Sequence, residues 1–239
     1  MNAARSAQAV ELVDANHILV DQGVLDAFGH VSVRTDDDPH RFLLARNLAP
    51  ALAGPGDIQE FTLDGETEDP RPPYLERFIH AEIYRSRPDV RAVVHSHSAA
   101  VVPFSVAQVP LRPVMHMAGF LPAQTPVFEI RDTMGDASDL LIRDGRSGQA
   151  LARSLGSGAV ALMRGHGSVA VGPSLRVAVY RAVYTEVNAR AQADAIRLGP
   201  YTCLTENEGA ATVATMATQM DRAWGIWQAR ARARFAEPG

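Results

Sequence analysis

The sequence predicts a single α/β domain, and three observations lead to this fold class. Its 239 residues are enough for one large domain or two small ones, and neither a linker nor an internal repeat divides them. The hydrophobic fraction of 46% and the charged fraction of 21% are those of a globular protein with a substantial core. Short apolar runs typical of strands alternate with longer helical patterns, an order that favours strands enclosed by helices.

Periodicity and turn residues assign the elements in order. In the first part of the chain we expect a helix at 6–23, strands at 30–34, 42–46 and 60–63, and a helix between Pro73 and Pro88. Next come a strand at 91–97, a short helix from 98, an irregular segment at 108–127, a helix at 138–155, strands at 159–164 and 168–171, and a long helix at 174–198. The apolar stripe of the long helix is expected at Val177, Tyr180, Tyr184, Val187 and Ala191. The predicted domain covers 1–239, with a core over about 6–205 and a C-terminal helix over about 207–235.

Composition excludes several classes of function. A net charge of -4 leaves no basic surface for nucleic acid. All 23 basic residues are arginine, so no lysine is available for a Schiff base, for pyridoxal phosphate or for a P-loop. The single Cys203 can form neither an intrachain disulfide nor a thiolate zinc site. No apolar stretch reaches 18 residues and the first residues lack a secretory pattern, so we expect a cytoplasmic protein without a membrane partner.

The most informative motif is His95-Ser96-His97, which follows the apolar run 92–94. On a strand, both imidazoles project from the same face with their roots about 6–7 Å apart. Two neutral imidazoles in this arrangement suit Zn²⁺ or a similar divalent ion. The motif alone is also compatible with a polar strand end, but its position after a core strand favours metal binding.

A second motif, Arg164-Gly165-His166-Gly167, follows the apolar run 159–163. Glycines on both sides of the histidine indicate a tight turn between two strands. Alone, this motif is an ordinary glycine turn with an exposed histidine. Together with His95 and His97 it supplies a third imidazole, and three ligands with an open position are typical of a catalytic metal site.

Glu76 and His80 lie one turn apart at the start of the helix expected between Pro73 and Pro88. A carboxylate in a first turn is stabilised by the helix N-terminus, so a structural role would be sufficient for Glu76. We expect His80 to be a core residue.

Together, these motifs resemble the class II aldolase and adducin family. In order along the chain, the matching pieces are Phe28-Gly29-His30-Val31-Ser32, Glu76, His95-Ser96-His97 and Arg164-Gly165-His166-Gly167. The resemblance implies a central, mainly antiparallel sheet flanked by helices in an α/β/α arrangement. It also implies a homo-oligomer, commonly a tetramer, with active sites at subunit interfaces, to which Tyr201 and the C-terminal helix are candidate contributors.

The resemblance further implies the roles of four residues. His95, His97 and His166 would bind one divalent metal ion per subunit, either Zn²⁺, Mn²⁺, Fe²⁺ or Co²⁺. Glu76 would be the acidic residue at the metal, acting as general acid or base, or as a ligand that the substrate displaces.

The sequence departs from the family members that act on sugar phosphates. Those enzymes carry Gly-Asn before the serine, a Thr-Gly turn after the next strand and a Ser-Ser pair before the catalytic glutamate. This chain has His30 in place of the asparagine, Arg46-Asn47-Leu48-Ala49 at the turn and Pro72-Pro73-Tyr74-Leu75 in place of the serines. Proline donates neither an N–H nor a hydroxyl, so a phosphate would lose several donors.

The pattern is closer to the family's decarboxylases of hydroxylated aromatic or pyridine dicarboxylates. We therefore expect a lyase: a metal-dependent, non-oxidative decarboxylase of an ortho-hydroxy aromatic or pyridine dicarboxylate in aromatic catabolism. In aldol cleavage and decarboxylation alike, a metal that chelates two substrate oxygens stabilises the electron pair left by the broken carbon–carbon bond. Glu76, or a water that it orients, is the expected proton donor.

A substrate carboxylate needs a polar or cationic partner. The predicted substrate contacts are His30, Ser32, Arg46 and Asn47, with Arg77, Arg131 and His116 as weaker candidates and Phe28, Tyr74 or Phe120 as apolar walls. Two alternatives stay open. One is a metal-dependent aldolase that cleaves a non-phosphorylated hydroxy-oxo acid. The other is a non-catalytic, adducin-like scaffold, which is disfavoured because such a scaffold would be expected to lose metal histidines that this chain retains.

Overall fold

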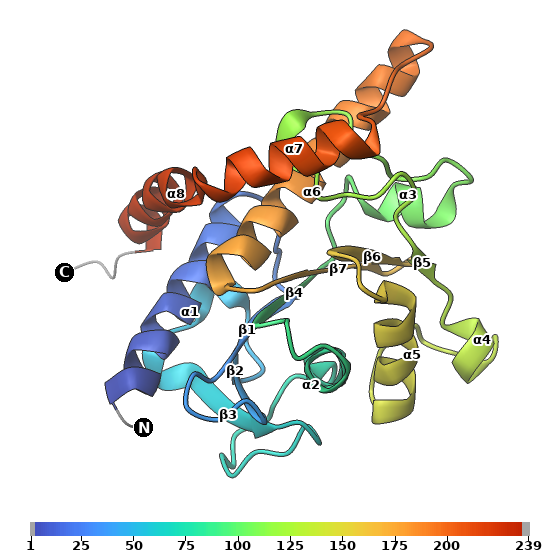
Figure 1. Ribbon diagram of the computed structural model, residues 1–239. Helices are drawn as coiled ribbons and strands as arrows, with labels where there is room; N and C mark the ends of the chain where they lie inside the picture. The colour runs from blue at the N-terminus through green and yellow to red at the C-terminus, as the bar shows by residue number, and fades with distance from the viewer. Residues whose placement is uncertain (1–2, 236–239) are drawn as a thin grey trace.

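A computed structural model describes residues 3–235, so the ends of the predicted domain, 1–2 and 236–239, lie outside the described residues (Figure 1). The strands are β1 (His30–Arg34), β2 (Arg41–Ala45), β3 (Ile58–Thr62), β4 (Ala92–Ser96), β5 (Val127–Phe128), β6 (Val160–Met163) and β7 (Gly167–Gly172). The α-helices are α1 (Ala3–Asp21), α2 (Arg77–Ser86), α3 (Val102–Val106), α4 (Arg131–Met134), α5 (Gly145–Leu155), α6 (Leu175–Leu198), α7 (Glu206–Ala217) and α8 (Met220–Phe235). Short 3₁₀ turns lie at Pro50–Leu52, Pro55–Asp57 and His116–Ala118.

The seven strands form one sheet in the order β3-β2-β1-β4-β7-β6-β5. Neighbouring strands are antiparallel except β5 and β6, which are parallel. Helices cover both faces: α1, α6 and α8 pack together on one face, and α2 and α5 pack together on the other (Figure 1). The predicted α/β class and the mainly antiparallel sheet flanked by helices are confirmed. None of the described helices combines the length and the hydropathy that crossing a membrane requires.

The two faces of strand β1 carry different side chains, apolar ones toward α1 and polar ones toward α2. All five of its residues are buried. Because side chains alternate along a strand, Val31 and Val33 face the layer of α1, while His30 and Ser32 face α2 and contact His80 there. The same strand therefore contributes apolar packing to one layer and polar groups to the other.

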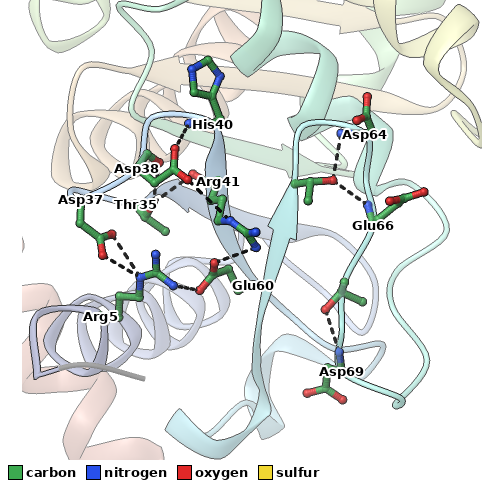
Figure 2. A network of polar contacts seen from close by, with 12 residues as sticks. Arg5, Thr35, Asp37, Asp38, His40, Arg41, Glu60, Asp64, Glu66 and Asp69 are labelled. Carbon is green, nitrogen blue, oxygen red and sulfur yellow. Dashed lines mark hydrogen bonds and ion pairs between the residues drawn. The ribbon is translucent and has the colours of Figure 1, made fainter.

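Ion pairs attach the start of the chain to the far edge of the sheet (Figure 2). Arg5 of α1 lies 3.1 Å from Asp37 and also contacts Glu60 of β3. The second oxygen of Glu60 accepts from Arg41 of β2 at 3.1 Å. Figure 2 shows Arg5 on α1 and its partners on β2, β3 and the turn before β2, so this network belongs to the scaffold rather than to the histidine motifs.

Three expected elements differ in the structure. The helix expected at 138–155 begins only at Gly145, where the Asp144 side chain caps it by accepting from the Ser147 N–H. The C-terminal helix expected over about 207–235 is two helices, α7 and α8, which are separated at 218–219. The helix expected just after Pro73 begins at Arg77.

The apolar stripe predicted for α6 is also wrong in part. Val187 is exposed, and the buried face carries instead Leu175, Ala178, Val179, Ala182 and Val183. At Gly172 a Cβ would lie 2.6 Å from the backbone of Ala178, so the end of β7 and the first turn of α6 approach each other closely. Ala178 and Ala182 belong to the buried face, and alanines carry a weak hydrophobic signal in the sequence, so the predicted stripe missed them.

Candidate metal centre and active-site cavity

The pairing of β4 with β7 brings the two histidine motifs together. His95 is in β4, His97 follows this strand directly, and His166 lies in the turn between β6 and β7. The register pairs Ser96 with Ser168, so the end of β4 lies beside that turn. At Gly167, a Cβ would lie 2.1 Å from the Ser96 carbonyl oxygen, which explains why glycine is required after His166.

Four side-chain ligand atoms converge at this point. Nε2 of His97 lies 3.1 Å from Nε2 of His95 and 3.1 Å from Nε2 of His166. Oε2 of Glu76, the N-cap residue of α2, lies 3.5 Å from Nε2 of both His95 and His166. All four ligand atoms lie within 4.8 Å of one another. The sequence predicted each of these residues, and the structure places them in one cluster.

Backbone carbonyls determine which nitrogen of two of these rings carries the proton. Nδ1 of His95 lies 3.1 Å from the Ser168 carbonyl oxygen, and Nδ1 of His166 lies 3.0 Å from the Leu140 carbonyl oxygen. A carbonyl only accepts, so both Nδ1 atoms are protonated and both Nε2 atoms direct lone pairs into the cluster. Lone pairs and a carboxylate that converge in this way repel one another unless a cation lies between them. The donor set therefore fits a divalent metal ion.

Charge and burial act in opposite directions on the groups of the cluster. Burial raises the pKa of the Glu76 carboxyl, but His95 and His166, when they carry a proton on Nε2, outweigh this and hold that pKa well below its ordinary value, as a metal cation at the same place would. The other carboxylate oxygen accepts from the Ile142 N–H at 3.0 Å. Burial, followed by the neighbouring His95, lowers the pKa of His97 to about 4. The carboxylate is thus ionised and His97 neutral near pH 7, the states in which both can ligate a metal.

The segment before α5 serves this cluster with its backbone, which explains why it is not helical. Leu140 offers its carbonyl to His166 and Ile142 its N–H to Glu76. Leu140 has a φ of 70°, the only positive φ at a non-glycine residue in the described part of the chain. Such a conformation costs on the order of 1–3 kcal/mol and concentrates at functional sites. A helix over 138–144 would take up these two backbone groups internally.

A cavity of about 620 Å³ opens beside the cluster. It is lined by Ala27, Phe28, Gly29, His30, Asn47, Leu48, Ala49, Tyr74, Leu75, Glu76, His97, Leu141 and His166. The cavity wall includes His30 and Asn47 of the predicted substrate contacts, as well as Phe28 and Tyr74 of the predicted apolar walls. Burial raises the pKa of Tyr74 to about 12, so its hydroxyl stays protonated and donates to the Leu48 carbonyl.

The other candidates for substrate contact lie elsewhere. Ser32 is fully buried and bonds to His80, and Nε of Arg46 donates to Asp57 at 2.7 Å. Arg77 donates to the Gly65 carbonyl at 2.7 Å, and Arg131 to Glu129 at 2.7 Å. His116 and Phe120 line a separate small hollow beside Tyr180. Among the described residues, no arginine lines the cavity.

The sequence did not reveal the groups that act through their backbone. Leu140, Ile142 and Ser168 each orient a residue of the cluster by a main-chain atom. Their side chains carry no chemistry, so residue type could not identify them. His80 is fully buried, as expected of a core residue.

Known proteins agree with this architecture. Residues 10–193 match the model of the class II aldolase and adducin N-terminal domain. The chain is 38% identical to the decarboxylase tropJ of Talaromyces stipitatus over 95% of both chains. It is 29% identical to a 3,4-dihydroxyphthalate decarboxylase of Terrabacter sp., over 80% of this chain and 82% of that protein.

A solved structure has the same fold. The L-fuculose 1-phosphate aldolase of Glaciozyma antarctica superposes with a TM-score of 0.79 at 21% identity, covering 99% of this chain and 94% of the aldolase. Over most of its length, in sequence and in fold, this chain belongs to the class II aldolase and adducin family.

Proposed function

We propose that this protein is a metal-dependent, non-oxidative decarboxylase of an ortho-hydroxy aromatic or pyridine dicarboxylate. His95, His97 and His166 hold one divalent ion, and Glu76 is the catalytic acid–base group. The observation that carries this proposal is the convergence of three Nε2 atoms and a carboxylate at the wall of a cavity with aromatic and apolar sides. The decarboxylases among the relatives support the reaction, and small-molecule chemistry agrees with the size of the cavity.

The cavity wall suits a planar substrate with anionic oxygens. Phe28, Tyr74 and Leu141 supply apolar surface for the ring, and His30 and Asn47 supply polar contacts for a carboxylate. Ser32 acts through His80, and Arg46 acts on the loop that carries Asn47 through its ion pair with Asp57. When bound, a divalent ion supplies positive charge that attracts the ortho-hydroxyl and carboxylate oxygens and withdraws electrons from the bond to be broken.

Glu76 moves the proton. Because its carboxyl is ionised at rest, it takes the proton of the ortho-hydroxyl and delivers it to the ring carbon that bears the departing carboxylate. The carbon–carbon bond then breaks, its electron pair returns to the ring, and CO₂ leaves. The phenolate oxygen of the product takes a proton from solvent, so the sum is one proton consumed and one CO₂ released.

The family resemblance supports two further parts of the proposal. We place the protein in the cytoplasm as a homotetramer or higher oligomer whose subunit interfaces adjoin the cavity. Ile196 and Leu198 near the end of α6 leave apolar surface exposed, as a subunit contact would require. Light scattering of the full chain at micromolar concentration measures the mass, and a monomer would contradict this assignment.

The test is CO₂ release by the Mn²⁺- or Zn²⁺-loaded protein from a panel of dihydroxyphthalates and hydroxypyridine dicarboxylates. The reaction is run in D₂O, so that NMR shows whether deuterium enters the ring at the carbon that lost CO₂. His95→Ala should lose the activity. The matched control is His40→Ala, which removes an exposed histidine of the turn before β2.

Each outcome decides between the candidate functions. CO₂ release that His95→Ala abolishes and His40→Ala retains supports the decarboxylase. No release from the panel, with one metal ion bound per chain, contradicts it and favours cleavage of a hydroxy-oxo acid. A folded protein that binds no metal favours the scaffold.

A further inference from the structure

A chain of buried polar side chains runs from the cavity wall into the space between β1 and α2. Nδ1 of His30 lies 2.7 Å from Nε2 of His80. Nδ1 of His80 lies 2.6 Å from Oγ of Ser32, which lies 2.7 Å from the Tyr84 hydroxyl. All four side chains are at most 4% exposed, so solvent cannot supply missing partners.

The two hydroxyls at the inner end of this series determine which group donates in each of its hydrogen bonds. Tyr84 and Ser32 each carry one O–H proton and share one hydrogen bond. Burial raises the pKa of Tyr84, so its hydroxyl keeps its proton, and among the described residues the one hydrogen-bond acceptor for that proton is Ser32 Oγ. Tyr84 must therefore donate to Ser32. The Ser32 proton then has one acceptor among the described residues, Nδ1 of His80.

The same assignment of protons continues through His80 to His30 at the cavity wall. With Nδ1 of His80 accepting, its ring proton lies on Nε2 and is donated to Nδ1 of His30. The proton of His30 then lies on Nε2. The opposite direction would leave one buried hydroxyl proton without an acceptor, which native structures rarely tolerate.

We propose that Tyr84, Ser32 and His80 are positioning residues that fix His30 as the tautomer protonated on Nε2, so that His30 presents an N–H donor to an anionic oxygen of the substrate. Nε2 of His30 has no hydrogen-bond partner among the described residues, and His30 lines the cavity. The identity of the ligand, a carboxylate or phenolate oxygen, rests on the proposed function, whereas the tautomer does not. The opposite tautomer would make His30 an acceptor and exclude such an oxygen.

The direct test is ¹⁵N NMR of the histidine rings in the full-length, Zn²⁺-loaded protein. His30→Gln identifies the His30 signals by their loss. We expect the wild-type His30 ring to carry its proton on Nε2. Ser32→Ala removes the donor to His80 and should move the His30 nitrogens toward the average of the two tautomers.

Two further variants keep the test decisive. The double variant Ser32→Ala, Tyr84→Phe removes both hydroxyls and leaves no orphan proton, so it should fold and show the same change. The matched control, Ser147→Ala, removes another fully buried serine hydroxyl, one that contacts Asp144, and should leave the His30 signals unchanged. A wild-type His30 protonated on Nδ1, or one indifferent to Ser32, overturns the proposal.

Kinetics separates positioning from a general structural effect. Ser32→Ala should raise KM by about fivefold with a smaller change in kcat, the size expected for one hydrogen bond to the substrate. In a His30→Gln background, the amide always offers an N–H, so Ser32→Ala should have no further effect on KM. An equal rise in both backgrounds contradicts the proposal. If no substrate of the panel reacts, the proposed function fails and the NMR result alone decides the tautomer.

Discussion

Two groups of histidines face each other across β1 and β4, and they differ in what each ring nitrogen contacts. His30 and His95 are paired in register, with ring centroids 5.0 Å apart. His30 and His80 approach to 2.7 Å, a distance that one shared proton explains. In the other group, Nε2 of His97 lies 3.1 Å from its two neighbours, and both neighbours direct lone pairs at it.

The partner of the second nitrogen accounts for this difference. A carbonyl at Nδ1 of His95 and of His166 leaves Nε2 as an acceptor. A hydroxyl chain ending at Tyr84 makes the neighbouring pair a donor–acceptor series instead. An imidazole cluster therefore becomes a metal site or a hydrogen-bonded pair according to what contacts the ring nitrogen that faces away from it, just as residues behind the ligands orient metal sites generally.

The largest effect should come from breaking the lone-pair cluster. His95→Ala removes one of three nitrogen ligands and should lower decarboxylation by about 1,000-fold, because a bound metal supplies several kcal/mol to the reaction. CO₂ release and metal content measured on the same sample check this. Retained activity without metal would contradict the role of the cluster.

Glu76→Gln should be the next largest change, since it removes the charge but keeps the shape and an acceptor for Ile142. We expect a loss of about 100-fold in kcat from missing proton transfer, with metal still bound at saturating concentration. Glu82→Gln is the matched control, because it changes another largely buried carboxylate of α2 that is outside the cavity lining. An equal loss in both variants would deny Glu76 a specific role.

The backbone support of His166 can be tested at Leu140. Leu140→Pro fixes φ near −65°, incompatible with the observed 70°, and should weaken metal affinity by about tenfold or more. Leu140→Gly removes the same side chain but accepts a positive φ, so it should bind metal as the wild type does. Metal titration monitored by competition with a chelating dye measures both, and equal weakening in the two variants would assign the effect to the lost side chain.

The hydrogen-bonded pair predicts a pH dependence of stability. Burial lowers the pKa of His80 from 6.5 to about 3, so the folded state binds fewer protons than the unfolded state between these values. Unfolding free energy should therefore fall as the pH falls through this window, by up to about 1.4 kcal/mol per pH unit for this one group. Urea unfolding of the metal-free protein at several pH values measures this change. In His80→Phe, the unfolding free energy should depend less steeply on pH. The same dependence of unfolding free energy on pH in the wild type and in His80→Phe would mean that His80 is charged in the folded state.

The smallest effect is expected at Arg46. Its side chain and that of its partner Asp57 are 35% and 21% exposed, and such pairs contribute about 0–1 kcal/mol. Arg46→Ala should raise KM by no more than about fivefold with kcat unchanged. A loss of substrate binding as complete as that of a cavity residue would make Arg46 a direct contact.

The sequence was sufficient for the parts of the site that depend on residue type and spacing. Histidines two apart on a strand, and a histidine between glycines, indicated His95, His97 and His166 before their distances were known. The paired strands then bring these motifs together, and Gly167 permits the close approach. The strands other than the two-residue β5, which was not expected, and the long helix α6 were predicted for the same reason, because their periodicity is local.

The predictions that were wrong concern residues whose position is set by contacts with residues distant in sequence. Residues 138–144 have helical composition, but His166 and Glu76 bind their backbone groups and prevent a helix. Arg46 was expected at the substrate, yet Asp57, which precedes the paired strand β3, holds it. The role of Ser32 could not be read from its motif, since it depends on His80 and Tyr84 from another element.

The different roles of the two histidine groups are tested by the metal-to-chain ratio of the wild type, His166→Ala and His80→Phe after dialysis against Zn²⁺. Because His166 is a ligand of the cluster and His80 is not, we expect one Zn²⁺ ion per chain in the wild type and in His80→Phe, and none in His166→Ala. A ratio that persists in His166→Ala, or that is lost in folded His80→Phe, would contradict this division.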